Sequence, residues 1–210
     1  VFHRLALVLL VYEYDAYRFG NNEWVKISVD LEMVQTEGFG ATKQVDPNMV
    51  IKKKNGNDVE VQEGWLGRII PFELVQETLL HEEATALKEK EERLTHVTAE
   101  QQEILDSLTE EEKEDITDVL NEDNTAFLAS QLIKMAKDLL KGHDAADYAE
   151  DSPEGKIITL MSLLDEEKEL KKAIKTDSAK LHLLTKETIE NLVDEQVYSL
   201  LELKWITPLI

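Results

Sequence analysis

The residues that come nearest to a metal site combine one imidazole and three carboxylates where a helix is expected to end: His143, Asp144, Asp147 and Asp151. Imidazole and carboxylate groups are common ligands of divalent cations, so this group could serve a metal-dependent hydrolase. The spacing matches no calcium-binding loop, however, and charged residues at a helix end are usually solvated. We keep this enzyme class only as an alternative.

Other patterns that support catalysis are incomplete. His81-Glu82-Glu83 begins like a zinc-protease helix, but such a helix needs a second His one turn later, where Thr85 stands. Gly38-Phe39-Gly40 lacks the third glycine of a dinucleotide-binding loop, and we expect a turn in which glycine supplies positive φ. No Gly-x-Ser-x-Gly elbow occurs, and the scattered histidines fit surface or packing positions. The sequence therefore predicts no catalytic, cofactor-binding or metal-binding residue.

The charge balance argues against direct contact with nucleic acid. The chain has 210 residues, of which 44 are acidic and 23 basic, a formal net charge of -21. Such a surface repels phosphates and anionic lipid. Lys52-Lys53-Lys54 is the one basic cluster, and it fits either a phosphate contact or a charged hairpin that resists edge-to-edge pairing. The absence of cysteine fits a reducing cytoplasm.

Residues 1–80 hold nearly all the strand and turn signals. The period-two alternation of residues 24–29 predicts a half-buried strand, and Asp46-Pro47-Asn48 predicts a loop. Residues 49–54 and 59–61 flank Asn55-Gly56, a strong hairpin signal, so we expect a small antiparallel sheet. The most apolar run, residues 5–12, is shorter than the roughly 20 residues that cross a membrane.

Helix formers dominate residues 81–210. Pro71 suits the first turn of a helix, Thr98 and Thr109 precede acidic residues as N-caps do, Gly142 is typical of a helix end, and Ser152-Pro153 marks the start of a long helix. The fold class is therefore mainly α, with a long coiled-coil-like helix and a small antiparallel hairpin in the N-terminal third. The helices beyond the Pro71 segment are expected at residues 82–94, 98–108, 109–120, 126–140, 153 to about 184, and 186–205.

The long helix carries an apolar series near heptad spacing: Leu160, Leu163, Leu170, Ile174, Leu181 and Leu184. Glu167 and Asp177 interrupt this seam. One hypothesis is thus a free-standing acidic adaptor protein that pairs with itself through the seam. For a partner of any kind, the expected interface residues are Leu163, Leu170, Ile174, Leu181, Leu184, Leu201 and Trp205.

Two stretches are far more specific than the rest. Residues 64–76 begin Gly64-Trp65-Leu66-Gly67 and continue through Ile70-Pro71-Phe72, and residues 201–209 contain Lys204-Trp205 followed by Pro208. Large aromatic residues serve as core residues and as interface anchors. We expect Trp65 and Phe72 in the core, and Trp205 fits either role. Because the chain begins with Val1 and an apolar run, we also expect it to be part of a longer protein.

At residues 64–76 and 185–206 the chain resembles the modification subunit of type I restriction-modification systems, an N6-adenine DNA methyltransferase. The resemblance implies a portion downstream of the methylase core. The family's cofactor loop, Phe-x-Gly-x-Gly, and its catalytic loop, Asn-Pro-Pro-Phe, do not occur in these residues. No catalytic or S-adenosylmethionine-binding residue therefore carries over to this chain, although its parent would use that cofactor.

The resemblance also implies the partners. In this family, such helices help to join the methylase to the specificity subunit, in a complex of two modification subunits and one specificity subunit. DNA would be gripped mainly by other parts of that complex. An acidic helical region suits this role, because an apolar seam can join a partner bundle without a positive field.

Overall fold

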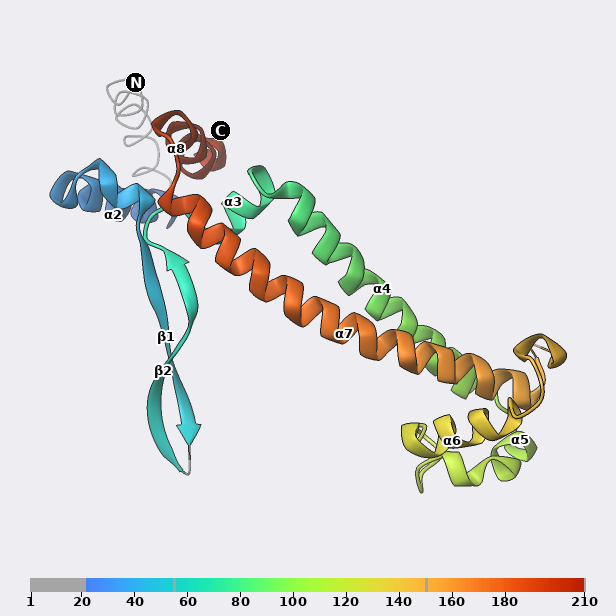
Figure 1. The fold of residues 1–210 in the computed structure, drawn as a ribbon. Coiled ribbons are helices and arrows are strands. Elements are labelled where there is room, and N and C mark those ends of the chain that lie inside the picture. The colour runs from blue at the N-terminus through green and yellow to red at the C-terminus, as the bar shows by residue number, and fades with distance from the viewer. Residues whose placement is uncertain (1–21, 55, 150, 210) are drawn as a thin grey trace. The chain divides into compact units, whose positions relative to one another are not determined.

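The computed structural model describes residues 22–54, 56–149 and 151–209 (Figure 1), so the apolar run at residues 5–12 lies outside the described part. The expected fold class is confirmed: seven α-helices and one two-stranded antiparallel sheet make up the described fold. The elements are α2 (Asn22–Glu37), β1 (Val45–Lys54), β2 (Asn57–Gly67), α3 (Phe72–Thr78), α4 (His81–Asp106), α5 (Glu110–Asp115), α6 (Ala129–Leu139), α7 (Pro153–Glu190) and α8 (Asp194–Leu201).

The chain divides into two compact units. The first unit consists of Val1–Thr85 and Ser178–Ile210, and the second unit is the intervening segment, Ala86–Asp177. The boundary expected near residue 80 lies close to the first junction. The last part of the chain, however, joins the N-terminal part in one unit, so the two specific stretches share a unit.

The hairpin at residues 49–61 is confirmed and extends further than expected. β1 pairs with β2 from Val45 opposite Gly67 to Lys54 opposite Asn57, and Gly56 adopts φ 82° in the turn. Asn55 lies outside the described residues. The loop expected at residues 46–48 is wrong, because β1 continues through Pro47 with a shift of register between Pro47 and Met49. A bulge is one of the places where a strand tolerates proline, which has no N–H to donate.

The strand expected at residues 24–29 is also wrong, because these residues belong to α2. The buried side chains that follow, Ile27, Asp30 and Val34, recur at intervals of three and four residues, which is the period of a helix. The alternation covered only six residues and could not distinguish the two periods. At the end of α2, Gly38 adopts φ 86°, so the expected glycine turn is confirmed there.

The N-cap expected at Thr98 is wrong, whereas the one at Thr109 is confirmed. α4 runs unbroken past Thr98, whose hydroxyl donates to the carbonyls of Leu94 (3.2 Å) and Thr95 (2.9 Å) within the helix. Thr109 forms a capping box with Glu112 at the start of α5. α5 ends at Asp115, and a 3-10 turn continues to Val119.

The long helix is confirmed and exceeds its expected length. The Ser152 hydroxyl accepts a hydrogen bond from the N–H of Gly155 (3.1 Å) where α7 begins, and α7 continues for 38 residues to Glu190. The last helix is shorter than expected: α8 starts at Asp194 and passes into a π-helical turn, Glu202–Ile206. α6 starts at Ala129, three residues later than expected, and Gly142 ends that segment with φ 83°.

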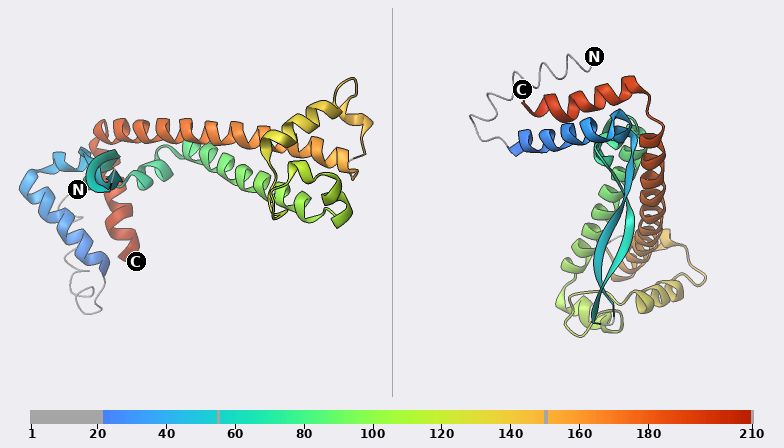
Figure 2. Two further views of the ribbon diagram at one scale, coloured as in Figure 1. Left: turned by 90° about the horizontal axis from the view of Figure 1, so that it is seen from below. Right: turned by 90° about the vertical axis from the view of Figure 1, so that its left-hand side faces the viewer.

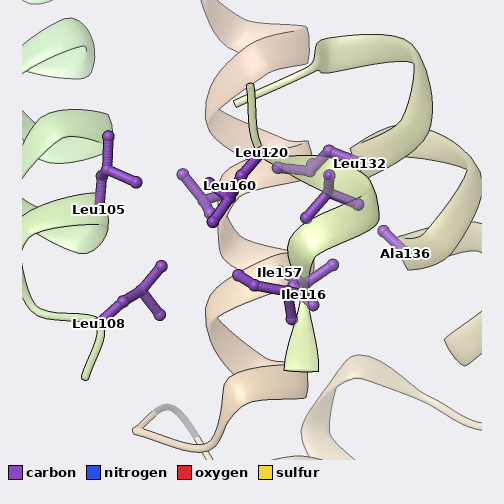
Figure 3. Packing of buried hydrophobic residues seen from close by; sticks show 9 residues of the cluster. Leu105, Leu108, Ile116, Leu120, Leu132, Ala136, Ile157 and Leu160 are labelled. Atoms are coloured by element: carbon purple, nitrogen blue, oxygen red, sulfur yellow. The ribbon is translucent and has the colours of Figure 1, made fainter. Parts of the chain in front are cut away.

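The core of the second unit lies where α6 packs against α7 (Figure 3). Leu132 and Ala136, one helical turn apart on α6, are both 0% exposed. They lie close to Ile157 and Leu160 of α7, while Leu105 approaches from α4. This cluster fixes the short elements α5 and α6 at one end of the long helices.

Within the second unit, α4 and α7 run side by side in opposite directions (Figures 1 and 2). Polar pairs join them along their length: the atom distances are 2.6 Å for Lys90–Asp177, 2.7 Å for Arg93–Glu166 and 2.8 Å for Gln101–Glu167. Leu160 and Leu163 are buried in the same unit. This part of the apolar seam of α7 is therefore covered by the chain itself.

Candidate functional site

The two specific stretches meet in the first unit and form two adjoining clusters. The histidine cluster consists of Gly64, Trp65 and Phe72 with His182, Thr185 and Lys186 of α7. The aspartate cluster consists of Asp30 of α2 with Ile69, Lys204 and Trp205. We take these clusters as the candidate functional site, since the most specific residues of the sequence lie in them.

His182 is the centre of the histidine cluster. Its Nε2 accepts a hydrogen bond from the backbone N–H of Trp65 at 2.9 Å, and its ring lies 4.9 Å from the Phe72 ring, centroid to centroid. His182 is thus a packing residue, as expected for a histidine outside any catalytic pattern.

Gly64 and Gly67 of the first stretch lie too close to neighbouring atoms to carry a side chain. A Cβ at Gly64, where φ is 78°, would lie 2.5 Å from His182 Nε2. A Cβ at Gly67 would lie 1.8 Å from the carbonyl oxygen of Ile70, a backbone atom. Only glycine avoids both contacts, which explains why the stretch carries this residue type twice within four positions.

Two further contacts join this stretch to α7. Lys186 places its ammonium 4.8 Å from the centre of the half-buried Trp65 ring, a cation–π contact. The Gln76 amide donates to the buried Thr185 hydroxyl at 3.0 Å, and that hydroxyl donates to the Leu181 carbonyl at 2.7 Å. The strand, α3 and α7 are therefore held in a fixed arrangement.

The aspartate cluster ties the C-terminal stretch to α2. Asp30 is only 8% exposed, and its carboxylate accepts hydrogen bonds from Trp205 Nε1 at 2.9 Å and from the Lys204 ammonium. The same ammonium donates to the carbonyl of Ile69 at 2.5 Å. A buried carboxylate needs such partners, because burial without them is costly. Trp205, whose role was open, is 1% exposed and belongs to the core.

Arg68 adds an ion-pair network beside these clusters. Its guanidinium contacts the Asp46 carboxylate twice, at 2.9 and 2.6 Å, and also binds Glu37 at the end of α2. The hydrogen bonds from Arg68 hold the pKa of Asp46 below its usual value, and those to Asp46 and Glu37 raise the pKa of Arg68. Fork-shaped pairs of this kind fix orientation as well as charge.

The expected interface residues are divided between core and surface. Leu163 in the second unit and Leu181, Leu201 and Trp205 in the first are buried against the chain itself, so in this structure they are not available to a partner. Leu170 and Ile174 are half-buried. Leu184 is the one that is exposed, at 37%. The chain itself therefore covers four of the seven expected interface residues.

The residues considered for metal binding are not assembled into a site. His143 Nδ1 lies 3.9 Å from Asp147 Oδ2, but that oxygen already accepts the backbone N–H of Asp144 at 2.9 Å. Among residues 22–54, 56–149 and 151–209, no group of three histidine, aspartate or glutamate side chains is placed to hold a metal ion. The Asp147 carboxylate caps the short 3-10 helix Ala145–Asp147 instead.

Sequence reasoning missed Asp30 and Lys204, and it did not distinguish His182 from the other histidines. Each acts through a contact more than 100 positions away in the chain, such as the 175 positions between Asp30 and Trp205. Local pattern carries no signal for such a pair. An acidic residue at a helical interval between Ile27 and Val34 was the available hint for Asp30.

Comparison of the chain with protein-family models, curated proteins and solved structures finds no match. In the part of the chain that the structure describes, no helix combines the length and the apolar character that a bilayer crossing requires.

Proposed function

We propose that this chain is a non-catalytic portion of the modification subunit of a type I restriction-modification system. Its parent would transfer a methyl group from S-adenosylmethionine to adenine N6 in DNA. This portion would join the methylase to the specificity subunit in the cytoplasm, and DNA would be reached through the whole complex.

One observation carries the proposal: the two stretches on which the resemblance rests contact each other. The Ile69 carbonyl of the first stretch accepts a hydrogen bond from Lys204 of the second at 2.5 Å, across 135 positions of sequence. Two stretches that resemble one family and also pack together behave as one structural signature. This favours a shared origin over chance similarity in two separate places.

The surface supports a protein partner more than a nucleic acid. A net charge of -21 repels phosphates, whereas paired helices with exposed apolar residues suit a helical partner. Leu183 and Leu184 of α7 are 54% and 37% exposed, although they adjoin the buried Leu181 and Thr185. This part of α7 is the best candidate contact.

The proposal is tested by mixing the purified chain with its cognate specificity subunit and measuring association by light scattering after gel filtration. We expect a complex, and we expect Leu184→Asp to weaken it by roughly tenfold, because a carboxylate would be buried against the partner. Leu128→Asp is the matched control, since Leu128 is also 37% exposed but precedes α6 in the second unit.

Two results would count against this function. A failure to associate, with both proteins folded, would remove the assembly role. Methyl transfer to DNA by this chain alone would contradict the non-catalytic assignment.

The self-pairing adaptor is the weaker alternative, because Leu160 and Leu163 of its seam are buried within the chain. Sedimentation over a range of concentrations distinguishes it. A monomer at all concentrations would eliminate the adaptor and leave the proposed function standing.

A further inference from the structure

A groove on the second unit lies outside the clusters described above. It has a volume of about 670 Å³ and runs between the end of α5, the following 3-10 turn and α6. Its floor is apolar and consists of Ile116, Val119, Met135 and Leu139. These residues belong to, or pack against, the core cluster of the unit, so the floor is supported from behind.

The spacing of the apolar residues along the floor suits a helix. Met135 and Leu139 are one helical turn apart on α6 and are half-buried, while Ile116 and Val119 are three residues apart and almost wholly buried. An amphipathic helix presents its own apolar side chains at intervals of three and four residues. Such side chains can pack against the half-buried Met135 and Leu139, as in helix-in-groove recognition.

The rim of the groove carries net negative charge. Three carboxylates, those of Asp115, Asp118 and Asp138, line it with a single ammonium, that of Lys134. Asp138 is paired with Lys141 at 2.6 Å, but neither Asp115 nor Asp118 forms an ion pair with any residue that the structure describes. Asp115 is the last residue of α5, where the helix dipole also disfavours a negative charge. A cationic group bound here would relieve both effects.

We propose that this groove binds a basic amphipathic helix of a partner protein. The apolar side chains of that helix would lie on Met135, Leu139 and the adjoining floor, and its lysine or arginine residues would flank them and pair with Asp115 and Asp118. A partner of this charge also suits the acidic chain as a whole. The inference does not depend on the proposed function, because no residue of the groove enters that argument.

The test uses the full chain and a synthetic helical peptide of about 18 residues, long enough to form a helix in water. The peptide has leucine at intervals of three and four residues and lysine elsewhere. The chain is labelled with ¹³C at the methionine methyl groups, which gives four resonances, from Met33, Met49, Met135 and Met161. We expect the Met135 resonance to shift as peptide is added, while that of Met49, on the hairpin, does not.

Matched variants separate the groove from general charge attraction. Asp115→Asn with Asp118→Asn should weaken peptide binding three- to tenfold, about the loss expected for two exposed ion pairs. Glu103→Gln with Glu111→Gln makes the same change of net charge at exposed sites outside the groove and should alter affinity less than about twofold.

Three outcomes would overturn the inference. The first is equal loss of affinity in both double variants. The second is equal binding of a peptide in which serine replaces every leucine, since the floor would then contribute nothing. The third is a Met135 shift that follows the concentration of the chain without peptide, which would assign the groove to a second copy.

Discussion

At the scale of single residues, the histidine cluster predicts that Gly64 tolerates no side chain. Gly64→Ala should destabilise the first unit by about 2–4 kcal/mol, through backbone strain at positive φ and through contact of the new methyl group with His182. Urea unfolding followed by tryptophan fluorescence measures this loss.

Gly38→Ala is the control for backbone strain. Gly38 has φ 86°, but nothing lies within 4 Å of the added Cβ, so it should cost only about 1–2 kcal/mol. The difference in lost unfolding free energy between the two variants measures the contact with His182. Adding His182→Ala to Gly64→Ala should reduce that difference. Equal losses in Gly64→Ala and Gly38→Ala would show that the contact does not matter.

The aspartate cluster predicts the effect of removing one hydrogen bond. Trp205→Phe keeps most of the buried ring but removes the Nε1 donor to Asp30, and we expect a loss of about 1–3 kcal/mol. A double-mutant cycle with Asp30→Asn isolates the pair from other effects of each substitution. Additive losses would mean that the two groups do not interact.

Paired carboxylates predict the response to acid. The pKa of Asp46 is lowered from 3.8 by Arg68, and that of Glu112 is lowered from 4.5 by the backbone N–H of Thr109 and by Lys156. Because both pKa values are lower in the folded state than in the unfolded state, this stabilisation is present at neutral pH. It begins to be lost near pH 4.5 and decreases further as the pH falls through the folded-state values.

Unfolding free energies measured between neutral pH and acid should therefore decrease below about pH 4.5. Glu112→Gln should be less stable than the parent at neutral pH and should depend less on pH in this range. A parent stability that is constant down to pH 3.5, below the ordinary pKa values of both groups, would contradict the assignment.

At the scale of elements, the sequence predicted the strands and helices whose signals are local. The hairpin follows from Asn55-Gly56 between two alternating runs, and the start of α7 follows from Ser152-Pro153. Thr98 misled because a threonine followed by glutamate resembles a cap even within a helix, where its hydroxyl can bond to the preceding turn. Whether a helix ends at such a threonine depends on the tertiary contacts of the turn that follows it.

The candidate site was predicted only in part, for the same reason. The glycine and tryptophan residues of the two specific stretches stood out by type, and each of them lies against a residue more than 100 positions away in the chain. Their partners, His182 and Asp30, lie in helices whose sequences give no sign of the contact. A partner that is distant in sequence is set by tertiary packing, which local pattern does not encode.

At the scale of the whole molecule, each unit has its own buried cluster, so a core substitution should act mainly on its own unit. Leu132→Ala should destabilise the second unit by about 2–5 kcal/mol, because Leu132 is 0% exposed. All three tryptophans, at positions 24, 65 and 205, belong to the first unit.

Two probes can therefore follow the two units separately. In Leu132→Ala, the circular dichroism of the helices should show an early transition in urea, while the tryptophan transition stays near that of the parent. Coincident shifts of both transitions would show instead that the units unfold together.

The polar pairs between α4 and α7 restrict how the second unit can change in length. Lys90 and Asp177, 2.6 Å apart, lie close in sequence to the points where the chain enters and leaves this unit, so the second unit is an insertion in the sequence of the first. Residues gained or lost in one helix alone would shift every later pair out of register. A relative with a longer or shorter second unit should therefore differ in both helices at once, in steps of about seven residues, which return side chains to the same face.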